Sequence, residues 1–140
     1  MTRDLNTLEA EIEKYKSDDD LWKVVPGIAN SAGNLCLHLC GNLQHFVGAV
    51  LGETGYRRNR EEEFSLKNIA KAELKNEIEQ TRKAIDDTLT KVTDDILSKP
   101  YPLDVLNEPV HTGFFLVHLV SHFNYHLGQI NYHRRMLNKV

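Results

Sequence analysis

The sequence predicts an all-α protein, most simply a single four-helix bundle domain over residues 1–140. Three observations support this: four long segments repeat apolar residues every three or four positions, none shows the sustained alternation of a strand, and Pro or Gly residues separate them. A chain of 140 residues is long enough to bury a core as one domain. A content of 41% apolar and 26% charged residues is typical of a globular rather than a disordered chain.

The first predicted helix covers about residues 4–16, and "SDDD" followed by Pro26–Gly27 interrupts the pattern. The second covers about 28–51 and ends at Gly52, a natural helix stop. Residues 28–52 contain no Asp, Glu, Lys or Arg and are long enough to cross a bilayer. Seven Asn, Ser, Gln and His side chains in this stretch are too many for hydrocarbon, so we expect an uncharged helix inside the bundle and no membrane contact.

The third predicted helix begins near "FSLKN" and continues to about Leu97, with charged residues covering its outer side. "SKPYPLDVLNEP" is a connector, and the fourth helix runs from about Thr112, a plausible N-cap, to Leu137. The connection over 52–65 is longer than a tight antiparallel turn needs. It could therefore leave its two helices parallel, although the sequence leaves this point open.

The charge pattern excludes several classes of protein. A net charge of −3 and a pI near 6.1 provide no basic field for nucleic acid. The N-terminus is charged throughout and does not read as a signal peptide. Cys36 and Cys40 form no disulfide framework and are expected to be small buried side chains, so we expect a reducing, cytoplasmic location.

Histidines dominate one strip of the fourth predicted helix. At about 100° per residue, His118 and His126 fall about 40° to either side of His122, and His111 and His133 lie close to it. The strip is about 30 Å long, too long for one ion, because each residue advances about 1.5 Å. Only histidines four apart can share an ion, so the candidate pairs are His118 with His122 and His122 with His126.

The second predicted helix can supply a third ligand. His38 and His45 share one face, with Asn42 between them. Three neutral imidazoles suit a borderline divalent ion such as Zn²⁺ or Ni²⁺ and leave coordination positions open for water or substrate, as catalytic sites do. The alternative is that these are core histidines satisfied by hydrogen bonds.

Other catalytic motifs fit less well. The residue after His122 is Phe123, so the HExxH motif of zinc proteases is absent, and we see no carboxylate base near the histidines. Only "EPVH" has Glu-x-x-His spacing, whereas a ferritin-like di-iron site needs two such motifs. There is no phosphate-binding loop and no nucleophile elbow in the sequence.

Two segments carry a resemblance to a known family. "NLCLHLCGNLQHFVGAVLGETGYRRNREEEFS" (34–65) and "GFFLVHLVSHFNYHLGQINYHRRML" (113–137) resemble the DinB/YfiT-like superfamily of small four-helix metalloenzymes, in particular its branch of short uncharacterised proteins. "HxxxHxGQ", here His122, His126, Gly128 and Gln129, is the most specific part, and "LHL" around His38 is the second.

The resemblance implies a fold and a set of ligands. In this superfamily one histidine of the second helix and an HxxxH pair of the fourth bind a divalent metal, which here implies His38, His122 and His126. The resemblance also implies an up-down-down-up bundle and, as in many members of the superfamily, a homodimer. Some members transfer low-molecular-weight thiols to electrophiles or use a thiol cofactor.

We therefore expect a metal-dependent enzyme acting on a small molecule, such as a thiol transferase or hydrolase with a thiol as a further cofactor. A non-catalytic metal-binding module and a structural helical dimer are the alternatives, and apolar surface on the second and fourth helices favours self-association. Four residues are candidates for the second shell or pocket. Asn42 and Gln129 could orient a bound water or substrate group, whereas His45 and His118 are expected to be structural more often than functional.

Overall fold

The structure is a computed structural model and describes residues 1–138. Its helices are α1 Thr2–Glu13, α2 Asp18–Trp22, α3 Ala32–Leu43, the π-helix η1 Gln44–Ala49, α4 Val50–Gly52, α5 Arg60–Ser65, α6 Lys71–Leu89, α7 Asp94–Ser98 and α8 Thr112–Leu137. Over residues 1–138 the only extended pairing is an isolated bridge between Pro100 and His111. The predicted all-α class is confirmed.

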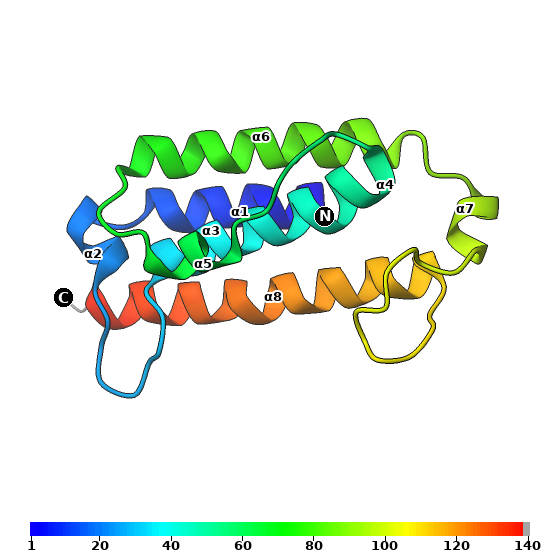
Figure 1. Cartoon of the computed structure of the whole chain (residues 1–140). Helices are drawn as coiled ribbons and strands as arrows, with labels where there is room; N and C mark the ends of the chain where they lie inside the picture. Colours follow the sequence, from blue (N-terminus) through cyan, green and yellow to red (C-terminus); the bar gives the residue numbers. More distant parts are fainter. Residues whose placement is uncertain (139–140) are drawn as a thin grey trace.

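Four long helical segments lie side by side (Figure 1). They are α1, α6, α8, and α3 with its continuation through η1 and α4; α3 packs against both α6 and α8, and α1 packs against the same two helices. In Figure 1, α3 and α6 run in one direction, and α1 and α8 run in the other. This course agrees with the up-down-down-up order that the family resemblance implies.

The hydrophobic core lies between these four segments. The apolar stripe predicted for the first helix is buried, and Leu5, Leu8 and Ile12 are each 0% exposed. The stripe of α6 is buried opposite it, and α8 contributes one side chain per turn over most of its length: Phe115, Leu119, Phe123, Leu127 and Ile130. Burial of one apolar face per helix stabilises the bundle and fixes which face of α8 and α3 remains free for a site.

The second helix begins four residues later than predicted. Gly27 has a positive φ of 85°, which ends the preceding turn, and the Ser31 side chain caps α3 by accepting a hydrogen bond from the Asn34 amide. After Leu43 the backbone widens into η1 before α4 ends at Gly52. The Phe46 carbonyl in this widened turn accepts a hydrogen bond from the Tyr101 hydroxyl, which ties the connector before α8 to η1.

The prediction of one third helix reaching Leu97 is wrong. The chain instead forms α5, a break over 66–70, α6, a second break over 90–93, and α7. Thr93 ends the continuity after α6 because its hydroxyl accepts a hydrogen bond from the Ile96 amide and so caps a new helix. The short helices α2 and α5 were not predicted, and α5 packs against α3, where it becomes part of the site.

Residues Ala32–Gly52 are apolar and long enough to cross a membrane by length and composition alone, but most of the apolar window is buried within the bundle. The outer face of α8 exposes apolar side chains, namely Phe114, Val117, Tyr125, Tyr132 and Met136. Self-association through such a surface stays a prediction.

Candidate metal centre

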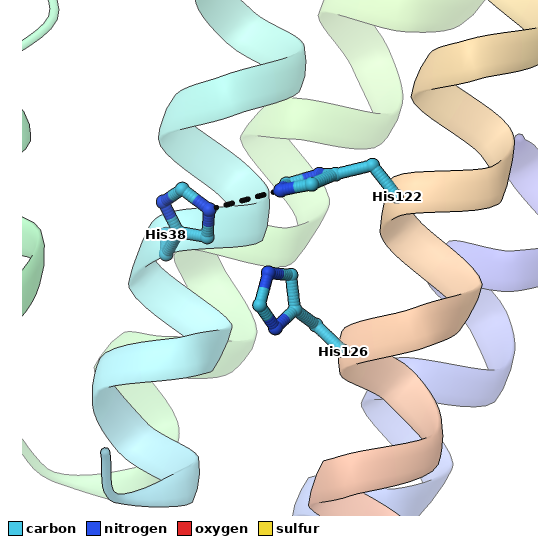
Figure 2. A group of neighbouring side chains, drawn as sticks. All are labelled: His38, His122 and His126. Atoms are coloured by element: carbon cyan, nitrogen blue, oxygen red, sulfur yellow. Dashed lines mark hydrogen bonds between the residues drawn. The ribbon is translucent and has the colours of Figure 1, made fainter. Parts of the chain in front are cut away.

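Three histidines from two helices converge on one point (Figure 2). His38 comes from α3, and His122 and His126 come from successive turns of α8. One ring nitrogen of each lies within 4.8 Å of the others, and Nε2 of His38 lies 3.2 Å from Nε2 of His122. Nitrogens around a tetrahedral ion at ~2.1 Å lie roughly 3.4 Å apart, so changes of side-chain torsion close the remaining gap.

A carboxylate holds His38 from behind. Nδ1 of His38 lies 2.9 Å from Oε2 of Glu63, which is 5% exposed. Because a carboxylate accepts hydrogen bonds, Nδ1 carries the proton and Nε2 presents its lone pair to the other two histidines. This is the carboxylate–histidine arrangement that orients metal ligands and raises their basicity.

Glu63 is itself fixed by an arginine. Nε and Nη2 of Arg58 donate to its two carboxylate oxygens at 2.7 and 2.9 Å. Burial raises the pKa of Glu63, but the hydrogen bonds from His38 and Arg58 outweigh burial and hold this pKa below its ordinary value. The carboxylate therefore stays ionised, and its charge is balanced by Arg58 inside the protein.

Local sequence explains how Glu63 reaches this position. The Asn59 side chain accepts a hydrogen bond from the Glu62 amide and starts α5, which places Glu63 against α3. Opposite it lies Gly41, one turn after His38, and a Cβ at Gly41 would overlap the Glu63 carboxylate. The glycine thus makes room for the carboxylate beside His38.

The two histidines of α8 differ in their support. Nδ1 of His126 donates to Oε1 of Gln129 at 2.7 Å, which leaves Nε2 of His126 as a free lone pair. Nδ1 of His122 is buried and has no hydrogen-bond partner among the described residues. With the proton of His122 on Nδ1, Nε2 of all three histidines presents a lone pair and no proton lies between them, a donor set that fits a cation.

Burial keeps these α8 imidazoles neutral. It lowers the pKa of His122 to about 4, with a further contribution from the neighbouring rings of His126 and His38. Burial also lowers the pKa of His126 and outweighs the hydrogen bond with Gln129, which acts in the opposite direction. Neutral imidazole is the form that binds a metal ion, so the chemistry of the site fits a divalent ion at neutral pH.

The three histidines line a cavity of about 560 Å³. Its polar wall includes Asn42, His118, Arg58 and Arg60. Its apolar wall is formed by aromatic and aliphatic side chains from η1, α5, the connector and α8: Phe46, Phe64, Val105, Phe115 and Leu119. A small molecule in this cavity would lie against the point where the three rings converge.

The other predicted residues separate into two groups. Asn42 and His118 line the cavity, and the His118 ring stacks on Phe115 with centroids 5.8 Å apart. Gln129 binds a histidine ring rather than facing the cavity. His45 packs on Phe46, lies outside both the histidine group and the cavity lining, and so has no visible role in the site.

Sequence reasoning missed Glu63, and the prediction of no carboxylate near the histidines is wrong. Glu63 is the third of three consecutive glutamates in "NREEEFS", which reads as a solvated charge run. The available signal was a capping pattern, Asn59 three residues before Glu62, which indicates a short helix and therefore one inward-facing glutamate.

The fold and the three-histidine group together define a small all-α bundle with a candidate metal centre. The chain matches the family model described as "Protein of unknown function (DUF1572)" over residues 3–140, so it belongs to the DUF1572 family, a DinB-like family. This confirms the resemblance drawn from the histidine motifs.

A solved structure supports the same fold. The chain is similar to a DinB-like protein from Bacillus cereus ATCC 10987, with a TM-score of 0.72 and 17% sequence identity over 96% of this chain and 85% of that chain. At this identity the likeness concerns the fold alone. A comparison with curated proteins finds no match.

Proposed function

We propose that this protein is a metal-dependent enzyme in which His38, His122 and His126 hold one divalent ion, Zn²⁺ or Ni²⁺, beside a substrate cavity. The reaction would be thiol transfer to a small electrophile or hydrolysis. The observation that supports this most is the convergence of three ring nitrogens, within 4.8 Å of one another, on the wall of a cavity of about 560 Å³.

A divalent ion in this position would supply Lewis acidity, which lowers the pKa of a water or thiol that reaches it. The surrounding residues have separate tasks. Glu63 fixes the tautomer of His38, and Gln129 does the same for His126. Asn42 and His118 offer polar groups to a substrate, and the apolar wall limits the water around it.

A non-catalytic metal-binding module is the second candidate. Its support is that the group joins α3 to α8, so an ion would also hold these two helices together. The cavity favours the catalytic proposal, because a closed structural site would surround the ion with four protein ligands.

Metal analysis of the untagged protein tests the proposal. The wild type should contain one equivalent of Zn²⁺ or Ni²⁺, and His38→Gln should contain none. His45→Gln is the matched control, because it changes a histidine of the same helical segment that lies outside the group and should leave the metal content unchanged.

Activity then separates the two candidates. The loaded wild type should accelerate either the addition of a small thiol to an electrophile or the hydrolysis of an activated ester, and the His38→Gln variant should not. A protein that binds one equivalent of metal yet accelerates neither reaction would favour the non-catalytic module. A wild type with no metal after incubation with Zn²⁺ or Ni²⁺ would refute both.

A further inference from the structure

We propose that the cavity beside the three histidines selects ligands that carry an anionic group, and that Arg60 binds this group. The inference rests on the proposed function, because the anion would belong to the substrate or thiol that reaches the metal. It concerns a residue outside the histidine group and its supporting contacts.

The first step is the charge of the cavity wall. Among the described residues, Arg58, Arg60 and histidines line this cavity, and no Asp or Glu side chain does. Glu63, which pairs with His38 and Arg58, is not among the residues that line this cavity and instead lines a separate cleft of about 530 Å³. A bound divalent ion would add further positive charge, so the wall is complementary to an anion.

The second step is that the two arginines differ. Arg58 is 12% exposed in its side chain and donates to both oxygens of Glu63, so its charge is already compensated. Arg60 has no carboxylate within ion-pair distance in residues 1–138. Arg60 therefore keeps its donors available at the cavity.

The third step is the position of Arg60 relative to the metal ligands. Its guanidinium carbon lies 5.2 Å from the centroid of the Phe64 ring, and the Phe64 ring lies 5.0 Å from that of His38. The aromatic ring orients the guanidinium and separates it from the histidines by one side chain. A ligand could thus place one end at the metal and an anionic end at Arg60, with its carbon chain along the apolar wall.

The test uses the untagged protein loaded with Co²⁺, whose visible absorption reports thiolate coordination. The probes are 3-mercaptopropionate and its methyl ester, which have the same thiol and spacer and differ in one negative charge. The measured quantity is the ratio of the two dissociation constants. Comparing this ratio between variants removes the intrinsic difference between the two thiols.

The wild type should favour the acid over the ester by about fivefold more than Arg60→Gln does. This expected effect is smaller than that of a buried charged hydrogen bond, because Arg60 is exposed. Arg57→Gln is the matched control. It removes the same charge from the neighbouring segment, but Arg57 lines the other cleft and should keep the wild-type ratio. Added salt should reduce the preference of the wild type.

The outcomes are distinguishable. If Co²⁺ binds and the ratio is the same in wild type and Arg60→Gln, the anion site is refuted while the metal proposal stands. Equal losses of the preference for the acid in Arg60→Gln and Arg57→Gln would refute Arg60 as the binding residue. They would indicate that the overall positive charge of the region causes the preference. If the wild type takes up no Co²⁺, the proposed function fails and this inference fails with it.

Discussion

Helix α8 carries two kinds of inward-facing histidine, and they differ in what their ring nitrogens contact. His133, near the C-terminal end, is 2% exposed. Its Nε2 donates to the Lys23 carbonyl at 2.9 Å, and its Nδ1 lies 2.8 Å from the Tyr15 hydroxyl. Burial raises the pKa of Tyr15, so the hydroxyl stays protonated and can donate. Both ring nitrogens are therefore satisfied by the protein.

The histidines of the candidate metal centre, His126 on α8 and His38 on α3, have a different pattern of contacts. His126 and His38 each use Nδ1 on a protein acceptor, Gln129 or Glu63, and leave Nε2 facing the other rings. His122 has a buried Nδ1 with no partner in residues 1–138. A histidine whose two ring nitrogens are both bonded to other protein groups is part of the structure, whereas Nε2 atoms that converge without such a partner form a donor set that suits a cation. Burial alone does not separate the two kinds.

The largest expected effect is on metal affinity. Replacing His126 with Ala removes one of three ligands, and affinity for Zn²⁺ should fall more than about 100-fold, beyond the range for loss of a supporting residue. Competition with a chromophoric chelator measures this. His133→Ala should stay within about threefold of the wild type, because its nitrogens are already occupied. Equal losses of Zn²⁺ affinity in His126→Ala and His133→Ala would contradict the distinction between proposed ligand histidines and structural histidines.

The second expected effect is on the free energy of unfolding, and here His133→Ala should have a larger effect than His126→Ala. His133→Ala removes the donor of the Lys23 carbonyl, leaves the Tyr15 hydroxyl with the Ile130 carbonyl as its partner, and opens a cavity. The free energy of unfolding of the metal-free protein should therefore fall by about 3 kcal/mol. His126→Ala should change it by less than about 1 kcal/mol, because the ring is only half-buried and its nitrogens gain little without a metal. Urea unfolding monitored by circular dichroism gives both values.

The sequence predicted the fold where local signals were strong. Helix α8 extends over the residues predicted, because apolar side chains recur without interruption and the residues before it cannot continue a helix. The third helix was predicted as one because its stripe continues to Ile96, but the Thr93 cap outweighs that periodicity. A short capped segment is difficult to detect against a longer apolar pattern.

The candidate site was predictable in part for a related reason. The spacing of His122 and His126 on one helix fixes their proximity, so sequence could nominate this pair. The choice between His118 and His126 came only from the family resemblance, since both lie four residues from His122. Glu63 could not be found by spacing, because its approach to His38 depends on how α5 packs against α3 around Gly41.

Glu63→Gln sharpens the comparison between the two kinds of histidine, because it changes the hydrogen-bond partner of a proposed ligand, His38, and leaves the histidine itself in place. The amide keeps an acceptor for Nδ1 of His38 but loses the charge that pairs with Arg58. Zn²⁺ affinity should fall about 10- to 100-fold, as for other carboxylates behind ligating histidines. Gln129→Ala, which removes a neutral acceptor from His126, should weaken binding less. An unchanged affinity in Glu63→Gln would mean that the carboxylate only balances Arg58.

The smallest expected effect tests whether Zn²⁺ affinity depends on the space that Gly41 leaves for the Glu63 carboxylate. In Gly41→Ala the new Cβ would overlap the carboxylate, and Glu63 cannot swing away without losing Arg58 and His38. Zn²⁺ affinity should fall by about tenfold, at the low end of the range for supporting residues. The gain in helix propensity from Gly to Ala, about 1 kcal/mol, partly offsets any loss of stability.

Gly128→Ala is the control for this change, because Gly128 lies in α8 two residues from His126, and a Cβ there meets nothing within 4 Å. It should raise the free energy of unfolding by up to about 1 kcal/mol through helix propensity and leave Zn²⁺ affinity unchanged. If both glycine variants bind Zn²⁺ as the wild type does, the carboxylate tolerates displacement and His38 does not depend on it. If only Gly41→Ala binds more weakly, the close approach of α5 to α3 at Gly41 supports the proposed ligand His38, because that approach places the Glu63 carboxylate at Nδ1 of His38.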